Sequence, residues 1–409
     1  MNRPARTSRR TFIKRSAALS TAAAGALGFP LIGGAQPASI TLGVLHPVTG
    51  PLSYSGQLCR LGAKLAIDEI NAAGGIKALG GARFDPLYAD APNPQAGTSE
   101  VERMNEQSAA AIIGAYASAI CLATTQAAAK YNLPHLVDVG VADQIVERGL
   151  KNVFRFGPGY RKTTEDAVKY LHTLNVLAGK PAKTVMIIHE ESLFGTGTAN
   201  LLAQELPKLG FDVKEVIKHA NPTRDFSNIV LRVKTVNPDI IIPANYYNEY
   251  ALFVRTMKQQ GVKAMAIFSV LGGAASSYKF VAEFPDIANG IIDVNHWFNP
   301  KNPAALALRK KVDAIKDQYF TYEVFLNYQA VYLLADAIER AKSAKREAII
   351  DALQASTWDR HFMPYGPTRF VNGQNTGAQP LTMQVRDKNI RVVLPSLYAE
   401  TAPVFPWKG

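Results

Sequence analysis

Short apolar segments alternate with longer helix-like segments along most of the chain from Ser39 onward. Continuous apolar strands separated by helices are typical of parallel sheets that helices cover on both faces. The alternation therefore predicts an α/β fold. The strand candidates are SITLGVL (39–45), AAIIGAY (110–116), KTVMIIHE (183–190), DIIIPANYY (239–247) and NGIIDVNHW (289–297).

Helical patterns fill the intervals between these strands. Leu58, Leu61 and Leu65 are spaced three and four apart, and the pattern ends on Gly74 and Gly75, as in an amphipathic helix with a glycine C-cap. Because a second set of strands and helices begins near residue 161, we expect two α/β domains in the 409 residues. The Pro- and Gly-containing stretches FGPGYR and MPYGPTRF are where we expect the chain to pass between them.

The first 35 residues differ in character from the rest. The stretch SRRTFIK, from Ser8 to Lys14, precedes an uncharged segment at 17–32, which is shorter than the roughly 20 residues that a membrane-spanning helix needs. This stretch resembles a twin-arginine export signal, with Ile13 as the one departure from the pattern. The resemblance implies cleavage near Ala35 and export of the folded chain to the periplasm.

Charge and cysteine content exclude several classes of protein. The first 35 residues hold six basic residues and no acidic ones, so their removal lowers the formal net charge from +12 to +6. The remaining Lys and Arg residues are scattered, without the aromatic-interleaved basic run of a nucleic-acid surface, and no nucleic-acid partner is expected. Cys59 and Cys121 are too few for a disulfide scaffold; one bridge and two separate thiols both stay open.

Motifs for catalysis, cofactors or metals are missing from the sequence. It contains no phosphate-binding loop, no H-E-x-x-H and no nucleophile elbow, and FGTGTAN (194–200) lacks the third glycine of a dinucleotide fingerprint. The seven histidines are never at metal-ligand spacing. The loops that follow the strands are rich in Gly, Ser, Thr and Tyr. We therefore expect a recognition surface with no catalytic residue, metal or cofactor.

Several segments carry a resemblance to a known family. GVLHPVTGPLSYSGQLCRLGAKLAIDEINAAGGI, AIIGAYAS, KNVFRFGPGYR, ESLFGTG, ANYYNEYALFVRTMKQQGVK and NYQAVYLLADAIERA occur in family order over nearly all of the mature chain. They resemble the type I periplasmic solute-binding proteins of ABC importers, in the leucine/isoleucine/valine and amide-binding class.

The resemblance implies two doubly wound parallel-sheet lobes joined by a three-segment hinge. Lobe one would comprise 39–159 and 297–367, and lobe two 160–296 and 368–409. A monomer of this kind would capture a small solute between its lobes and deliver it to the permease and ATPase of an importer.

Binding residues follow from the same resemblance. Ser118 matches the serine that opens a helix and holds the ligand carboxylate; independently of the family, a helix N-terminus attracts anions, although Ser118 could also be a plain N-cap. Val139 and Val141 would contribute backbone N–H and C=O groups. The aromatic wall and its flank would comprise Tyr54, Ser55, Phe194 and Tyr246.

One position departs from the family pattern. The acid that pairs with the α-ammonium group of amino-acid ligands falls on Val270, which is apolar. The ligand either lacks that amine or uses another acid, for which Glu323 is the candidate; alternatively Glu323 is an exposed residue of a first helical turn. A sensor that uses the same fold and an α/β enzyme are the alternative functions.

Overall fold

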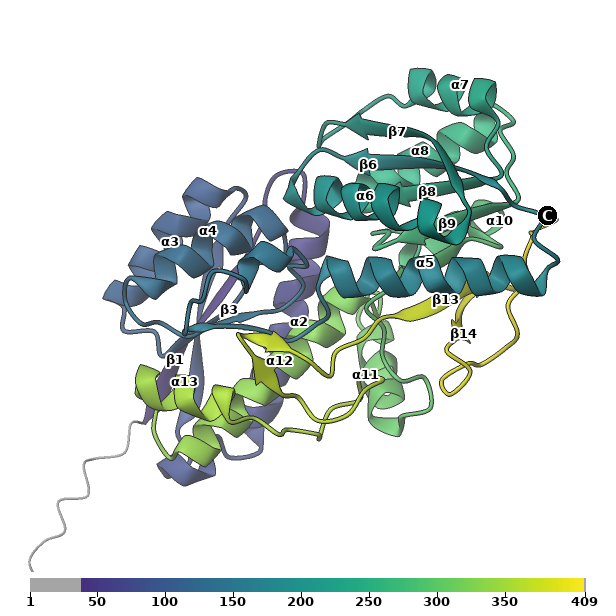
Figure 1. Cartoon of the computed structure of the whole chain (residues 1–409). Helices are drawn as coiled ribbons and strands as arrows, with labels where there is room; N and C mark the ends of the chain where they lie inside the picture. The colour runs from purple at the N-terminus through teal and green to yellow at the C-terminus, as the bar shows by residue number, and fades with distance from the viewer. Residues whose placement is uncertain (1–37, 408–409) are drawn as a thin grey trace, which may run out of the picture. The chain divides into compact units, whose positions relative to one another are not determined.

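The computed structural model describes residues 38–407, and the export signal expected at 1–35 lies outside them. These residues form two seven-stranded sheets (Figure 1). The first sheet has the order β11-β12-β5-β4-β3-β1-β2. Its strands are β1 (Ser39–His46), β2 (Arg83–Asp90), β3 (Ala111–Gly114), β4 (His135–Val137), β5 (Val153–Arg155), β11 (Phe370–Val371) and β12 (Gln374–Asn375).

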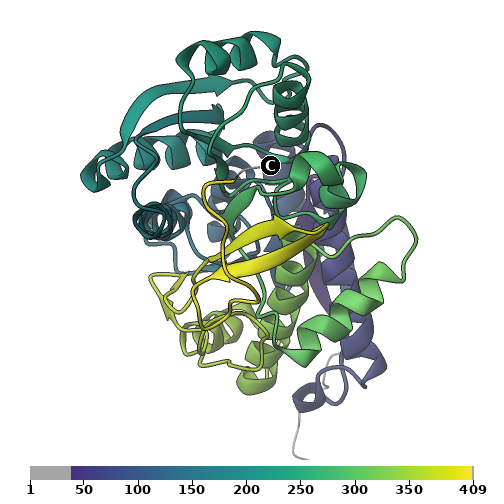
Figure 2. The ribbon, with the colours of Figure 1, turned by 90° about the vertical axis from the view of Figure 1, so that its right-hand side faces the viewer.

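The second sheet repeats the strand order of the first, as β14-β13-β10-β9-β8-β6-β7. Figure 2 shows its C-terminal hairpin, β13 and β14, as the long yellow strand pair. The strands are β6 (Thr184–Glu190), β7 (Asp212–His219), β8 (Ile240–Ala244), β9 (Ala266–Val270), β10 (Ile292–Asn295), β13 (Leu381–Arg386) and β14 (Asn389–Leu394).

Helices connect the parallel strands in both halves. We call the first sheet with its helices lobe one and the second sheet with its helices lobe two. The helices are α2 (Ser53–Ala72), α3 (Pro94–Glu106), α4 (Ser118–Ala129), α5 (Tyr160–Leu177), α6 (Leu193–Glu205), α7 (Ser227–Val236), α8 (Tyr247–Gln259), α9 (Tyr278–Glu283), α10 (Pro285–Ala288), α11 (Pro303–Asp313), α12 (Tyr322–Ala341) and α13 (Arg346–Gln354).

The predicted α/β class and the two-lobe fold are confirmed, with one refinement to the sheets. Strands β1 to β5 and β6 to β10 are parallel, but each sheet ends in antiparallel strands, β11–β12 in lobe one and β10–β13–β14 in lobe two. The sheets are therefore mixed, and not purely parallel as the sequence predicted.

One predicted lobe boundary needs correction. The sequence assigned all of 368–409 to lobe two, yet β11 and β12 belong to the first sheet. Gln374 pairs with Arg155 in the parallel register between β12 and β5, and the Arg155 Nε–H also donates to Gln374 Oε1 over 2.6 Å. These contacts hold residues 370–375 in lobe one, and the other predicted boundaries stay predictions.

Three segments connect the two sheets. They run from β5 to α5, from β10 to α11, and from β12 to β13. The first contains Gly157 and Gly159. A Cβ atom at Gly159 would collide with both Asp143 Oδ1 and Arg155 Nη2, so this segment requires glycine at that position.

Both cysteines are buried and free, Cys59 in α2 and Cys121 in α4. Of the two alternatives left open by the sequence, the structure has two separate thiols. None of the helices within residues 38–407 combines the length and the apolarity that a membrane crossing requires.

Candidate ligand-binding site

A small pocket lies between the two lobes. Ligands of open α/β sheets bind beyond the carboxyl ends of the strands, and the lining follows this rule, because it comes from the segments after β3, β4, β6, β8, β9 and β10, together with the start of α12. The lining residues are Tyr116, Ser118, Val139, Val141, Phe194, Asn245, Tyr246, Leu271, Gly273, Asn295, His296 and Tyr322.

Five of the nine residues singled out from the sequence line this pocket: Ser118, Val139, Val141, Phe194 and Tyr246. They come from both lobes and from four separate strand–helix connections. Their part in binding a solute remains a prediction, but the structure brings them together.

Ser118 is the first residue of α4, and its side chain does not cap that helix. Its hydroxyl oxygen instead accepts the backbone N–H groups of Val141 and Ala142, both over 3.2 Å. Since the oxygen already accepts two hydrogen bonds, the hydroxyl proton is left to donate. Ser118 is only 2% exposed, so its donor points into a largely dry space.

The backbone groups of Val141, which the sequence assigned to solute contacts, have partners within the protein, and their role toward a solute stays a prediction. The Val141 N–H donates to Ser118 Oγ, and its carbonyl oxygen accepts from Arg155 Nη1 over 2.8 Å and from the Tyr160 N–H over 2.7 Å. Both backbone groups are therefore used within the protein. Val141 presents its side chain to the pocket, and its peptide groups hold the loop in place.

Four helix N-termini meet at the pocket. Ser118 opens α4, Phe194 is the second residue of α6, Tyr246 is the N-cap of α8, and Tyr322 opens α12. Each N-terminus carries partial positive charge from its free N–H groups and the helix dipole.

Three of these four N-termini have a buried glutamate beside them. Glu190 accepts the Gly195 N–H at the start of α6 over 2.7 Å, while Glu249 and Glu323 lie in the first turns of α8 and α12. The first turn of α4 has no acidic residue. The first turn of α4 thus lacks a carboxylate of its own, and Asp138 lies beside the residues that precede it, where it accepts the Tyr116 N–H over 3.1 Å.

Two lining residues have backbone conformations that side chains rarely adopt. Tyr116, after β3, has φ of 63°, and Leu271, after β9, has φ of 56°. Such left-handed residues cost on the order of 1–3 kcal/mol each and cluster at functional sites. Sequence reasoning missed both residues, since nothing in a tyrosine or a leucine indicates a positive φ.

Buried carboxylates hold these two turns. The Tyr116 N–H donates to Asp138 Oδ1 over 3.1 Å, and Asp138 Oδ2 lies 3.0 Å from His46 Nε2. On the other lobe, Asp293 Oδ1 accepts the Gly272 N–H over 3.0 Å, and Oδ2 accepts from Ser276 Oγ and Asn295 Nδ2.

His296 is a lining residue that the sequence did not single out. Both of its ring nitrogens are buried and without a hydrogen-bond partner among the described residues. Burial lowers the pKa of His296 to about 3, with the charge of Arg155 acting in the same direction, so the ring is a neutral imidazole. Its ring packs against Gly157 of the first connecting segment, where a Cβ atom would lie 3.0 Å from His296 Cε1.

The other four predicted residues lie outside the pocket lining. Val270 is fully buried in β9, and the chain turns at the next residue so that Leu271 faces the pocket. Tyr54 lies at the cleft mouth, whereas Ser55 is buried in the first turns of α2. Glu323 is 2% exposed, which excludes the alternative of an exposed first-turn residue.

Contacts at the cleft mouth join the lobes. The Tyr54 and Tyr247 rings lie 4.5 Å apart, Lys279 Nζ lies 4.4 Å from the centroid of the Tyr54 ring, and Asn248 Nδ2 donates to the Pro51 carbonyl over 3.2 Å. A cation over an aromatic ring face is attracted by the ring quadrupole. Because these contacts join residues of lobe one to residues of lobe two, the structure is a form in which the two lobes are closed on each other.

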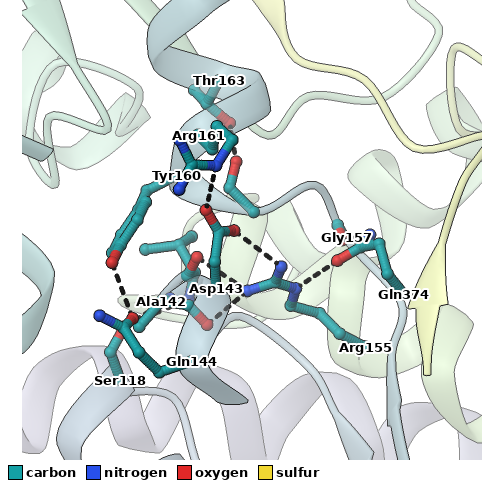
Figure 3. Close-up of polar contacts among 12 residues, drawn as sticks. Ser118, Ala142, Asp143, Gln144, Arg155, Gly157, Tyr160, Arg161, Thr163 and Gln374 are labelled. Atoms are coloured by element: carbon teal, nitrogen blue, oxygen red, sulfur yellow. Dashed lines mark hydrogen bonds and ion pairs between the residues drawn. The ribbon is translucent and has the colours of Figure 1, made fainter. Parts of the chain in front are cut away.

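Arg155 connects the binding loop to the hinge (Figure 3). Its guanidinium group donates to the carbonyls of Val141 and Ala142 and to Asp143 Oδ1, while Gln374 receives the Nε–H. Arg161, on α5, approaches the second oxygen of Asp143 at 3.4 Å. The guanidinium group is buried, and its hydrogen bonds go to the 141–143 loop of lobe one and to Gln374 in β12, from which the third connecting segment leaves.

His46, Cys59 and Asp138 form a buried group with metal-ligand atom types, their ligand atoms lying within 4.8 Å of one another. His46 Nε2 lies within hydrogen-bond distance of Asp138 Oδ2 and of Asn327 Oδ1, at 2.9 Å for the latter. Burial raises the pKa of the Cys59 thiol well above its usual value, and Asp138 also accepts the Tyr116 N–H over 3.1 Å. The group therefore acts as a hydrogen-bonded support beneath Tyr116.

Comparisons with known proteins agree with this geometry. The profile of a family described as periplasmic binding protein matches residues 39–389. The chain is 28% identical over 382 residues to Leu/Ile/Val-binding protein homolog 7 of Brucella melitensis, covering 90% of this chain and 95% of that protein.

Two solved structures share the fold. The branched-chain amino acid transporter substrate-binding protein LivJ of Streptococcus pneumoniae, in complex with isoleucine, is 20% identical, with a TM-score of 0.76 over 90% of this chain and 100% of its own. An ABC transporter solute-binding protein of R. palustris, in complex with benzoate, is 17% identical, with a TM-score of 0.77 over 89% and 98%.

The chain belongs to the periplasmic binding protein family, and its fold is that of the type I members. Members of this family bind solutes and are not enzymes. The family implies a small-molecule ligand, a periplasmic location and an ABC transporter as partner.

Proposed function

We propose that this protein captures a small carboxylate-bearing solute in the cleft between its lobes and delivers it to the permease of an ABC importer. The observation that carries the proposal is the N-terminus of α4, where Ser118 keeps a free hydroxyl proton and the first turn itself contains no acidic residue. A helix N-terminus that combines unpaired N–H groups with a positive dipole end binds anions.

The opposite wall supports the same reading of the site. Phe194 and Tyr246 lie with ring centroids 5.1 Å apart, and Tyr246 faces Tyr116 of lobe one at 5.8 Å. A pocket of this kind, with apolar and aromatic walls and a few fixed polar groups, suits a small organic ligand. Branched-chain or other amino acids, amides, and aliphatic or aromatic carboxylates are the classes we consider, since relatives of the fold hold isoleucine and benzoate.

Capture requires opening and closing of the lobes. The three connecting segments form the hinge, and the mouth contacts of Tyr54, Tyr247 and Asn248 are made only when the lobes meet. A solute that binds both lobes stabilises the closed form by its differential affinity for the two states. The closed monomer is the form that we propose the permease receives.

The binding proposal is tested by a thermal-shift screen of amino acids, amides and small carboxylates, because a ligand that binds only the folded state raises the melting temperature. For a solute found in this way, Ser118→Ala together with Tyr246→Ala is expected to lower the affinity at least tenfold, measured by calorimetry. An unchanged dissociation constant in a double variant with an unchanged circular-dichroism spectrum would refute the assigned site.

We also propose export by the twin-arginine pathway, on the strength of the SRRTFIK stretch. Replacing both Arg9 and Arg10 by Lys keeps the charge while removing the arginine pair, and the uncleaved protein is expected to accumulate in the cytoplasm. Cell fractionation and immunoblotting measure this, and periplasmic protein at the normal level in the variant would exclude the pathway.

A further inference from the structure

The lining of the pocket contains no Asp, Glu, Lys or Arg residue. His296, its one imidazole, is 1% exposed and neutral. An ionic group of the solute can therefore be matched only by helix N-termini and by neutral hydrogen-bonding groups. Helix N-termini favour negative charge and oppose positive charge.

Two of the neighbouring glutamates are committed elsewhere. Glu190 accepts the Ser192 N–H with Oε2, and the Gly195 N–H and the Ser192 hydroxyl with Oε1, all between 2.6 and 2.7 Å. Glu249 is buried in the first turn of α8 and does not line the pocket. Neither carboxylate is placed to pair with a cation of the solute.

Glu323 is the remaining candidate for such a pair. It follows Tyr322 in the first turn of α12, where Tyr322 lines the pocket and Glu323 does not. Burial raises its pKa to about 7, against the opposing effect of the neighbouring Thr321, Ser55 and Tyr322 hydroxyls. Burial thus disfavours the charged carboxylate that an ammonium group of the solute would need as its partner.

The polar groups left free in the pocket include hydrogen-bond donors for a carboxylate, and none of them carries a negative charge. Ser118 Oγ already accepts two hydrogen bonds and keeps its proton, and the buried Tyr116 hydroxyl has no partner among the described residues. Each of these can donate to a carboxylate oxygen, and a neutral His296 adds one ring N–H together with one uncharged nitrogen acceptor. An ammonium group has three donors of its own and would need acceptors or a negative charge in the same space.

We infer that the solute carries a carboxylate group but no ammonium group, so that it is an organic acid with an apolar body and not an amino acid. This inference rests on the proposed function, because it assumes that a carboxylate binds at α4. The inference adds one statement to the proposed function. Because the lining is uncharged, an amino-acid zwitterion should bind more weakly than the carboxylic acid of the same shape without the amine.

The test uses pairs of compounds that differ only in the α-amine: leucine with 4-methylpentanoate, and phenylalanine with 3-phenylpropanoate. Calorimetry at pH 7 with the purified protein is expected to show that the acid of the better-binding pair binds at least a hundredfold more tightly than its amino acid. Equal or tighter binding of the amino acid would overturn the inference and leave the proposed function intact.

A third compound separates the two proposals. The corresponding amides, 4-methylpentanamide and 3-phenylpropanamide, keep the body and remove the negative charge. If an amide binds more tightly than its acid, the carboxylate site at α4 is wrong, and the proposed function fails on that point together with the inference.

Glu323→Gln tests the remaining route for an amine. We expect the affinity for the organic acid to change by less than threefold, because the glutamine keeps the shape of the side chain. If the wild-type protein binds an amino acid and Glu323→Gln weakens that binding by tenfold or more, Glu323 is an ammonium partner and the inference is overturned.

Discussion

In lobe one, the pocket wall ends on α4, whose first turn has no acidic residue, whereas in lobe two α6 and α8 each begin beside a buried glutamate. The two lobes share one strand order, so this difference lies in side chains and not in architecture. A carboxylate is attracted by an uncompensated helix end and gains little from a compensated one. We therefore propose that lobe one holds the charged group of the solute and that lobe two covers it with aromatic rings.

The buried aspartates behind the two walls differ as well. Asp138 in lobe one is close to His46 and accepts backbone N–H groups; burial alone raises its pKa, but these partners outweigh burial and the pKa is lowered. Asp293 in lobe two has only neutral donors, and burial raises its pKa to about 6. Equivalent supports therefore differ in the pH range over which they stay charged.

The largest expected effect contrasts these aspartates. Asp138→Asn is expected to lower the free energy of unfolding by about 3 kcal/mol at pH 7, because an amide N–H would face His46 where a carboxylate oxygen now lies. Asp293→Asn should change it by less than about 1 kcal/mol, since it removes a charge that is already disfavoured there. Urea unfolding monitored by fluorescence measures both.

The dependence of folding stability on pH should also differ between the Asp138 and Asp293 variants. Because the folded-state pKa of Asp293 is raised, its contribution to stability falls as pH rises from about 4 to about 6, and Asp293→Asn should flatten that part of the profile. The lowered pKa of Asp138 contributes stability above its ordinary value, and that contribution is lost as pH falls. Identical pH profiles for the two variants would show that the aspartates are equivalent.

An acidic residue introduced into the first turn of α4 should make this helix end resemble that of α6, which already has Glu190 beside it. Ala119→Asp places a carboxylate in the first turn of α4 and is expected to weaken binding of an organic acid about tenfold to thirtyfold, while the melting temperature stays unchanged or rises. Thr196→Asp makes the same addition to α6, where Glu190 already accepts N–H groups, and should change affinity less than threefold. Calorimetry on both variants compares the two ends; equal losses would contradict the assignment of the charged group to lobe one.

The smallest expected effect concerns the mouth. Asn248→Ala removes the amide that donates from lobe two to the Pro51 carbonyl of lobe one, an exposed contact. We expect a twofold to fivefold faster dissociation of the solute in stopped-flow measurements, since an exposed hydrogen bond contributes about 1 kcal/mol or less. No change in dissociation rate would mean that closure is stabilised by the aromatic contacts alone.

Much of the fold could be predicted from the sequence because central strands are continuously apolar. The five predicted strands correspond to β1, β3, β6, β8 and β10. Sequence reasoning missed β7, whose side chains alternate in exposure at the sheet edge, and β4 and β5, which are three residues long. Strands of three residues are too short to show a hydrophobic periodicity, and their position in the sheet depends on the neighbouring strands.

Pocket-lining residues could be predicted from the sequence where they lie at the start of a helix. They could not be predicted where the backbone conformation of a turn determines which side chain faces the pocket. Ser118 and Tyr246 are of the first kind. Val270 and Leu271 are of the second: an ungapped alignment selects Val270, but the positive φ at Leu271 directs the chain so that Leu271 lines the pocket. His296 depends on the packing of two connecting segments, which no local pattern reports.

The residue Val141 joins three parts of the molecule through its backbone. Its N–H reaches the Ser118 hydroxyl, and its carbonyl receives both the Arg155 guanidinium and the first N–H of α5, which packs against lobe two. A rotation of α5 away from lobe one must either break the Tyr160 hydrogen bond or drag the Val141 loop with it. Pulling the lobes apart therefore disturbs the hydrogen bonds of Ser118, so that, for a solute held as we propose, mechanical opening and release would be a single event.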